Sequence, residues 1–158
     1  MGKDLNIYET GNGGDLEIFN GDLSFSESLF KDIYVSLFGG NVEASTLGNE
    51  EDNEERFDFW ANSLLFQDQK EKQFNSETER ILNTVVLNSS GRIFILNAVK
   101  EDLSFIREKF NLEVDVFLLN RNRVKIEIKI LSVSNELDHS LQLIWDSLKN
   151  QIITQKII

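Results

Sequence analysis

The 158-residue sequence contains no cysteine and no proline. The absence of cysteine excludes disulfides, catalysis by a thiol and metal sites with thiolate ligands. It also fits a reducing compartment. Without proline it has no proline-rich linker or polyproline ligand, which is consistent with one compact unit. No apolar run approaches the roughly 20 residues that span a bilayer, and the first residues do not have the pattern of a signal peptide. We therefore expect a globular domain without a membrane segment.

Basic residues are scarce as well. The chain has 16 Lys and Arg against 27 Asp and Glu, and its formal net charge at pH 7 is -11. Affinity for a phosphate backbone comes from clustered Lys and Arg, which are scattered here. We therefore expect no nucleic-acid partner and no binding to an anionic membrane surface. An acidic chain can still be steered toward basic protein surfaces.

The clearest fold signal runs from Leu112 to Val133. Hydrophobic and polar residues alternate on both sides of a short polar break at 120–123, which predicts an antiparallel β-hairpin with one buried face. A two-stranded hairpin leaves open edges, and a partner can extend such an edge by adding a strand. Lys125, Glu127 and Lys129 fall on the polar face, where their charges would limit uncontrolled pairing.

Helical patterns surround this hairpin. A first helix is expected from about Ser24 to the Gly39-Gly40 pair, and a second starts at Ser76, with Glu79 at the capping-box spacing. A third and a last helix are expected from apolar stripes at spacings of three and four. The third stripe is Leu96, Val99, Leu103, Ile106 and Phe110, and the last is Leu137, Leu141, Ile144, Leu148 and Ile152.

The N-terminal region has short strand patterns at 4–8 and 16–19, separated by turn residues. Asn20-Gly21-Asp22 is expected to turn the chain again, so the region is expected to form a small hairpin or arm. Together these elements predict an α+β fold, a small sheet with a C-terminal antiparallel hairpin packed against three to four helices. Residues 1-133 would form the main domain. Residues 134-158 would add a C-terminal helical extension, packed on the domain or on a partner.

No constellation of residues predicts chemistry. His139 lies beside Asp138, but neighbouring helical positions point about 100° apart and a lone His is a poor metal site. The carboxylates Glu27, Glu79 and Glu101 are candidates for glycosidic cleavage only because any helical Glu is. The acidic run at 50–55 lacks the order of a calcium loop, and the glycines at 11–14 lack the Lys of a phosphate loop. We expect no catalytic, cofactor or metal site.

An aromatic-dense segment, Phe57 to Phe66, contains Phe59 and Trp60. Trp145 similarly widens the apolar face of the expected last helix beside Leu141. Large aromatic side chains either fill a core or act as hot spots of an interface, and both readings remain open here. The apolar C-terminal stripe is a further candidate docking surface.

The order of these pieces resembles that of phage-Mu-type tail baseplate proteins, which are similar to the small, lysozyme-like baseplate wedge proteins of T-even phages. The pieces that carry the resemblance are Gly21-Asp22-Leu23, Leu37-Phe38, Phe59-Trp60-Ala61-Asn62, the capped helix Ser76 to Val86, and Ala98-Val99-Lys100-Glu101-Asp102-Leu103 before the hairpin. The stretch Ser104 to Lys109 lacks the Trp-Glu-Pro-Arg-type motif of the wedge relatives. Their Gly-Trp-Trp-type motif is reduced here to Phe59-Trp60.

The resemblance implies a virion structural protein, made in the host cytoplasm and present in several copies in the baseplate of a contractile tail. It implies contacts with other wedge proteins and with tail tube and sheath proteins, and in relatives sheath strands can extend a sheet edge. It supplies no catalytic residue. The alternatives are a tail-associated peptidoglycan hydrolase and a bacterial intracellular adaptor. The residues expected to contact partners are Phe59, Trp60, Lys125, Glu127, Lys129, Leu141 and Trp145.

Overall fold

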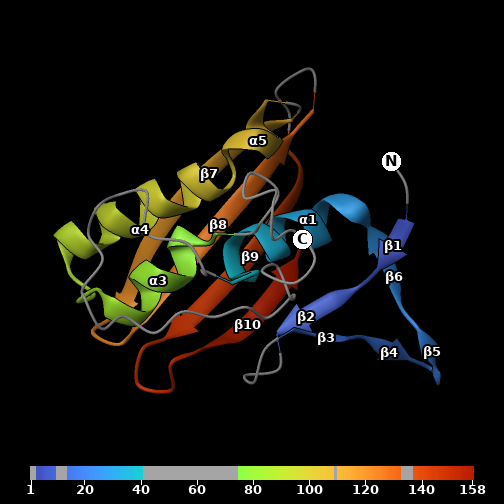
Figure 1. Ribbon diagram of the computed structural model, residues 1–158, viewed down its shortest axis with the longest axis horizontal. Coiled ribbons are helices and arrows are strands. Elements are labelled where there is room, and N and C mark those ends of the chain that lie inside the picture. The colour runs from blue at the N-terminus through green and yellow to red at the C-terminus, as the bar shows by residue number, and fades with distance from the viewer. Residues whose placement is uncertain (1–2, 10–13, 41–74, 109, 133–136) are drawn as a thin grey trace, which may run out of the picture.

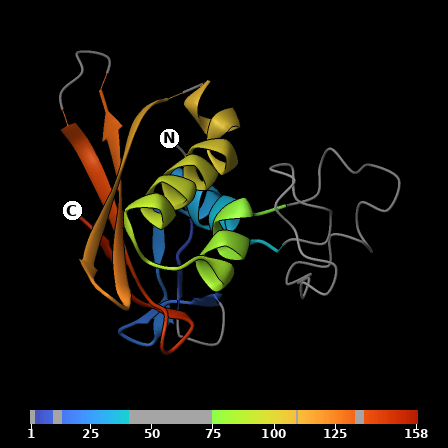
Figure 2. The same cartoon turned by 90° about the vertical axis from the view of Figure 1, so that its left-hand side faces the viewer.

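A computed structural model describes residues 3–9, 14–40, 75–108, 110–132 and 137–158. They form an α+β fold, as the sequence predicts (Figure 1). A four-stranded antiparallel sheet forms one layer, and the helices cover one of its faces (Figure 2). The other face of the sheet is not covered by any helix of the described part of the chain.

The sheet has the strand order β10-β9-β8-β7. β7 (Asn111–Asn120) and β8 (Arg123–Leu131) are the predicted hairpin, and the prediction is confirmed. Hydrophobic residues of the two strands stand opposite one another, as in the pair Val116 and Ile126. These inward side chains are buried because a period of two places every second side chain on the helix-covered face.

The prediction of a C-terminal helix is wrong. The segment forms two strands, β9 (Leu137–Asp146) and β10 (Gln151–Ile157), and β9 pairs with β8 along its length. Leu141, Leu143 and Trp145 are spaced by two, so the sequence fits a strand as well as a helix. Pairing with β9 satisfies the backbone groups along the edge of β8. Residues that were expected to form a helical extension therefore belong to the same sheet as the hairpin.

The described residues contain four helices on one side of the sheet: α1 (Ser28–Phe38), α3 (Glu77–Thr84), α4 (Ser89–Asp102) and the short α5 (Ser104–Arg107). The expected cap of α3 is confirmed, because the Ser76 hydroxyl oxygen accepts a hydrogen bond of 3.1 Å from the backbone N–H of Glu79. The expected start of the first helix is wrong, since residues 25–27 belong to a strand and α1 begins at Ser28. The expected end is confirmed, because α1 stops at Phe38, immediately before Gly39-Gly40.

The core lies between the helices and the inner face of the sheet. Completely buried side chains come from both layers; they include Ile33, Leu37, Ile95, Ala98, Val99, Leu103, Val124, Ile126, Ile128, Leu141 and Leu143. The expected stripe of α4 is shifted by one position at its start, because Ile95 is buried and Leu96 is only partly so. Burying this apolar surface is the main favourable term in folding.

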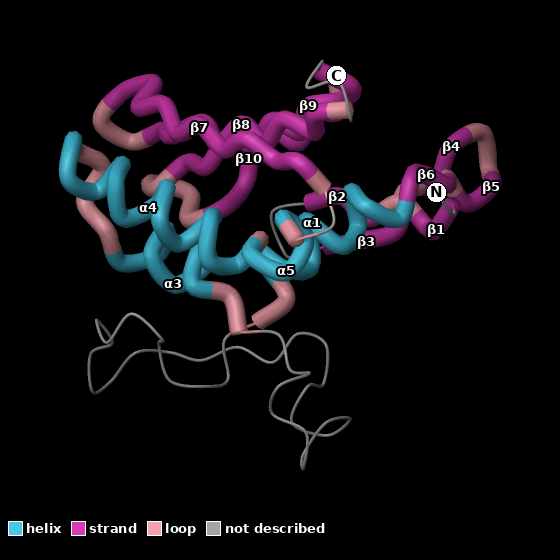
Figure 3. The backbone as a smooth tube through the Cα atoms, turned by 90° about the horizontal axis from the view of Figure 1, so that it is seen from above, coloured by secondary structure: helices cyan, strands magenta, loops and turns pink. Residues whose placement is uncertain are grey.

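The N-terminal residues form an arm of six short strands: β1 (Lys3–Leu5), β2 (Ile7–Glu9), β3 (Gly14–Leu16), β4 (Ile18–Phe19), β5 (Asp22–Leu23) and β6 (Phe25–Glu27). The pairs are β1-β6, β2-β3 and β4-β5. The arm extends away from the two-layer body, with β4 and β5 at its far end (Figures 1 and 3). The expected turn at its tip is confirmed: Asn20 and Gly21 have φ values of 53° and 82°, as the two central residues of a tight hairpin turn require.

Candidate functional site

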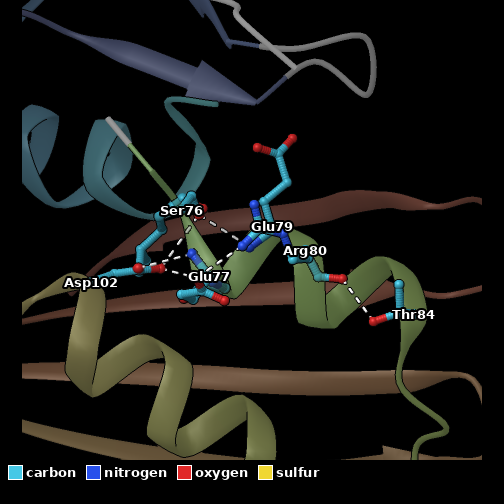
Figure 4. Close-up of polar contacts among 8 residues, drawn as sticks. Ser76, Glu77, Glu79, Arg80, Thr84 and Asp102 are labelled. Atoms are coloured by element: carbon cyan, nitrogen blue, oxygen red, sulfur yellow. Dashed lines mark hydrogen bonds and ion pairs between the residues drawn. The ribbon is translucent and has the colours of Figure 1, made fainter. Parts of the chain in front are cut away.

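A polar cluster lies where α1, α3 and α4 meet, and we call Ser76, Glu77, Arg80 and Asp102 the helix-junction cluster (Figure 4). The Asp102 carboxylate accepts hydrogen bonds from two backbone N–H groups at the start of α3, from Glu77 at 3.0 Å and from Thr78 at 2.8 Å. The Ser76 hydroxyl donates to the backbone carbonyl of Leu37 in α1. The cluster therefore joins three helices through their terminal backbone groups.

The electrostatics of the cluster follow from burial. Burial raises the pKa of Asp102 to about 7, because the charged carboxylate loses water, and its hydrogen bonds to α3 only partly oppose this. Glu77 and Arg80 form an ion pair of 2.9 Å, and each side chain is 1% exposed. Charges buried this deeply are costly to remove from water, and pairing offsets part of that cost.

This cluster has the protected carboxyl group that a hydrolase needs, but its geometry is that of a helix cap. Both oxygens of Asp102 are directed at the start of α3, and Glu77 is shielded from solvent by its ion pair and surroundings. Glu77 therefore offers no exposed carboxyl group to a polysaccharide, and both oxygens of Asp102 accept hydrogen bonds from α3. The sequence did not predict the role of Asp102, because 24 and 25 residues separate it from the two amides it caps.

The second candidate is the outer face of the sheet, where Lys125, Glu127 and Lys129 lie. Lys129 forms an ion pair of 2.8 Å with Asp115 of β7, and Glu127 accepts a hydrogen bond of 2.7 Å from the Gln142 amide of β9. The structure thus brings the three predicted residues together, but on a central strand. The expectation of a two-stranded hairpin with two open edges is corrected, because β9 occupies the edge of β8.

The other predicted contact residues lie elsewhere. Leu141 and Trp145 are 0% and 5% exposed, so the prediction that they face a partner is wrong. Their side chains lie on the inner face of β9 and fill the core, because that strand alternates inward and outward residues. Phe59 and Trp60 fall outside the described residues.

The two edges of the sheet differ. Near β10 the arm approaches, and the Gln155 amide donates a hydrogen bond of 3.2 Å to the backbone carbonyl of Ile7 in β2. At the opposite edge, no strand of the described residues pairs with the outer side of β7. The side chain of Arg92 in α4 reaches the backbone carbonyl of Val116 there, at 3.5 Å. Among the described residues, β7 is therefore a ten-residue edge strand whose outer side is not paired with another strand.

No group of three or more His, Asp or Glu side chains among the described residues is arranged to hold a metal ion. Within those residues, no helix is both long and apolar enough to cross a membrane.

Comparisons with known proteins leave the family open. No family model, no curated protein and no solved structure matches this chain. The resemblance to phage-Mu-type baseplate proteins therefore stays a prediction that rests on the order of its sequence motifs.

Proposed function

We propose that this chain is a non-enzymatic structural component of a contractile phage tail baseplate. It would link wedge, tube and sheath proteins by protein–protein contacts. The observation that carries the proposal is the outer edge of β7, a ten-residue strand that no other strand of the described residues pairs with on that side. An assembly protein can use such an edge because an added strand gains main-chain hydrogen bonds without remodelling the domain.

The side chains around β7 support strand addition. On the outer face, Phe117 and Leu119 are 42% and 48% exposed near one end of the strand. Toward the other end lies the exposed acidic residue Glu113, whereas Asp115 beside it is already paired with Lys129. An incoming strand would therefore match β7 best with apolar residues at one end and a basic residue beside Glu113 at the other, since cross-strand pairs of these kinds are favourable.

The test is co-expression of the chain with sheath, tube and wedge proteins encoded beside it, followed by affinity purification. Wild-type protein is expected to retain a tail protein. The double variant Phe117→Lys/Leu119→Lys should lose it, because charges on an edge strand block pairing. Ile93→Lys, a change at a similarly exposed apolar residue of α4, should retain it.

Hydrogen exchange of the purified complex distinguishes strand addition from side-chain docking. Amides on the outer side of β7 should exchange readily in the free chain and become protected when the partner is bound. If wild-type protein binds no tail protein, the baseplate proposal fails. If a partner binds and β7 stays unprotected, the proposed mode of binding fails.

A further inference from the structure

The arm carries exposed apolar side chains that no described part of the chain covers. Ile18, Phe19 and Phe25 are 70%, 69% and 58% exposed, and Leu23 is also exposed. We call these four residues the apolar tip. Ile18 and Leu23 stand directly opposite one another across β4 and β5, and so lie on the same face of that hairpin. A hairpin this short cannot bury its own apolar face, and an exposed cluster of this kind marks a contact site.

The arm is held in place by its backbone. Asn6, Glu17 and Ser24 form a closed ring of three hydrogen bonds: Asn6 N–H to the Ser24 carbonyl at 2.9 Å, Ser24 N–H to the Glu17 carbonyl at 2.8 Å, and Glu17 N–H to the Asn6 carbonyl at 3.0 Å. Around this ring the strands exchange partners. An ion pair between Asp4 and Lys31 ties the base of the arm to α1. An arm ordered in this way loses little conformational entropy when it binds.

The charge around the apolar tip has one sign. Between Lys3 and Lys31 the sequence has no Lys, Arg or His, and its acidic residues are Asp4, Glu9, Asp15, Glu17, Asp22 and Glu27. Hydrogen bonds from Ser24 and Asn6 lower the pKa of the Glu17 carboxyl, which therefore stays ionised at neutral pH. Asp15 and Asp22 are exposed beside the apolar residues.

From this pattern we infer that the arm inserts its apolar tip into an apolar pocket rimmed by Lys and Arg on a different protein. Charge complementarity selects the partner, since a basic rim would pair with the acids beside the tip. A second copy of the chain fits poorly, because each copy has a net charge of -11. The lysines on the outer sheet face are also already paired, Lys125 with Glu127 and Lys129 with Asp115. This contact is separate from the edge of β7 and does not depend on it.

The test follows backbone amide signals of the isotope-labelled full chain by NMR while a peptide is added. One peptide alternates Lys with Leu, and its counterpart has Glu in place of Lys. The Lys peptide should shift signals of residues 15–25, and the effect should weaken with salt. The double variant Ile18→Ser/Phe19→Ser should weaken binding at least about tenfold, since both apolar contacts are removed.

Two variants make the result specific. Leu148→Ser, at a residue 77% exposed in the turn between β9 and β10, should bind the Lys peptide as wild type does. Asp15→Asn/Asp22→Asn keeps the apolar tip and should weaken binding by removing its charge. Because the altered side chains are exposed, signals outside the arm should stay unchanged and show that the fold is intact.

Several outcomes would overturn the inference. Equal binding of the Glu peptide would remove the role of charge, and shifts outside the arm with residues 15–25 unmoved would place the site elsewhere. Sedimentation equilibrium gives a further outcome. A wild-type dimer that Ile18→Ser/Phe19→Ser dissociates would make a second copy the occupant.

Discussion

Asp102 shows how one residue decides local stability. It caps α3 through the amides of Glu77 and Thr78, yet burial raises its pKa to about 7 from an ordinary value of 3.8. The folded chain therefore holds this proton at pH values where the unfolded chain has released it. The favourable contribution of protonated Asp102 to the free energy of unfolding is complete below about pH 4. It is lost as the pH rises through 7.

This linkage predicts a pH dependence that Asp102→Asn removes. Between about pH 4 and 7, the unfolding free energy of wild type should fall relative to the variant, with a slope approaching about 1.4 kcal/mol per pH unit. Hydrogen bonds to Lys31 and Arg123 lower the pKa values of Asp4 and Asp146. These two groups change the unfolding free energy equally in both proteins, so their contributions cancel in the difference. Urea denaturation at three pH values measures the difference. A difference that is constant across this range would contradict a pKa of about 7 for Asp102.

At the scale of the element, the start of α4 depends on a close backbone approach. Asn88 caps this helix by accepting a hydrogen bond of 2.8 Å from the N–H of Gly91. A Cβ added to Gly91 would lie 2.1 Å from the backbone carbonyl oxygen of Val86. Only glycine lets the chain pass from α3 into α4 by this route.

Gly91→Ala should therefore destabilise the protein by about 1–3 kcal/mol, the usual cost of overpacking. Helix propensity alone would give the opposite sign, a gain of roughly 0.5–1 kcal/mol. Thermal and urea denaturation measure the change, with Ser90→Ala as the control at the exposed neighbouring position. If Gly91→Ala proves as stable as Ser90→Ala, the carbonyl of Val86 must be free to move.

At the scale of the whole molecule, the C-terminal residues complete the sheet. β9 contributes the buried side chains Leu141, Leu143 and Trp145, and β10 contributes Ile152. Without these strands the edge of β8 and part of the core would face water. The region is thus a structural necessity for the sheet, whereas an appended helix would have been dispensable.

Truncation after residue 133 should abolish cooperative unfolding, because it removes two of the four strands of the sheet. Removal of only Ile157 and Ile158, which are exposed, should leave a cooperative transition. Circular dichroism during urea titration compares the two shortened chains. A sharp transition for the chain of residues 1–133 would show that the main domain folds alone.

Elements whose sequence signals are local could be predicted from the amino-acid sequence. The β7–β8 hairpin, the Ser76 cap and the Asn20-Gly21 turn each follow from residues at most a few positions apart or from an unbroken alternation. Tertiary packing determines the state of residues 137–157, whose apolar spacing fits both a helix and a strand, because a partner strand satisfies the backbone groups along the edge of β8. Tertiary packing also determines the cap of α3 by Asp102 and the burial of Trp145. These depend on segments that are distant in sequence and meet only when the core forms.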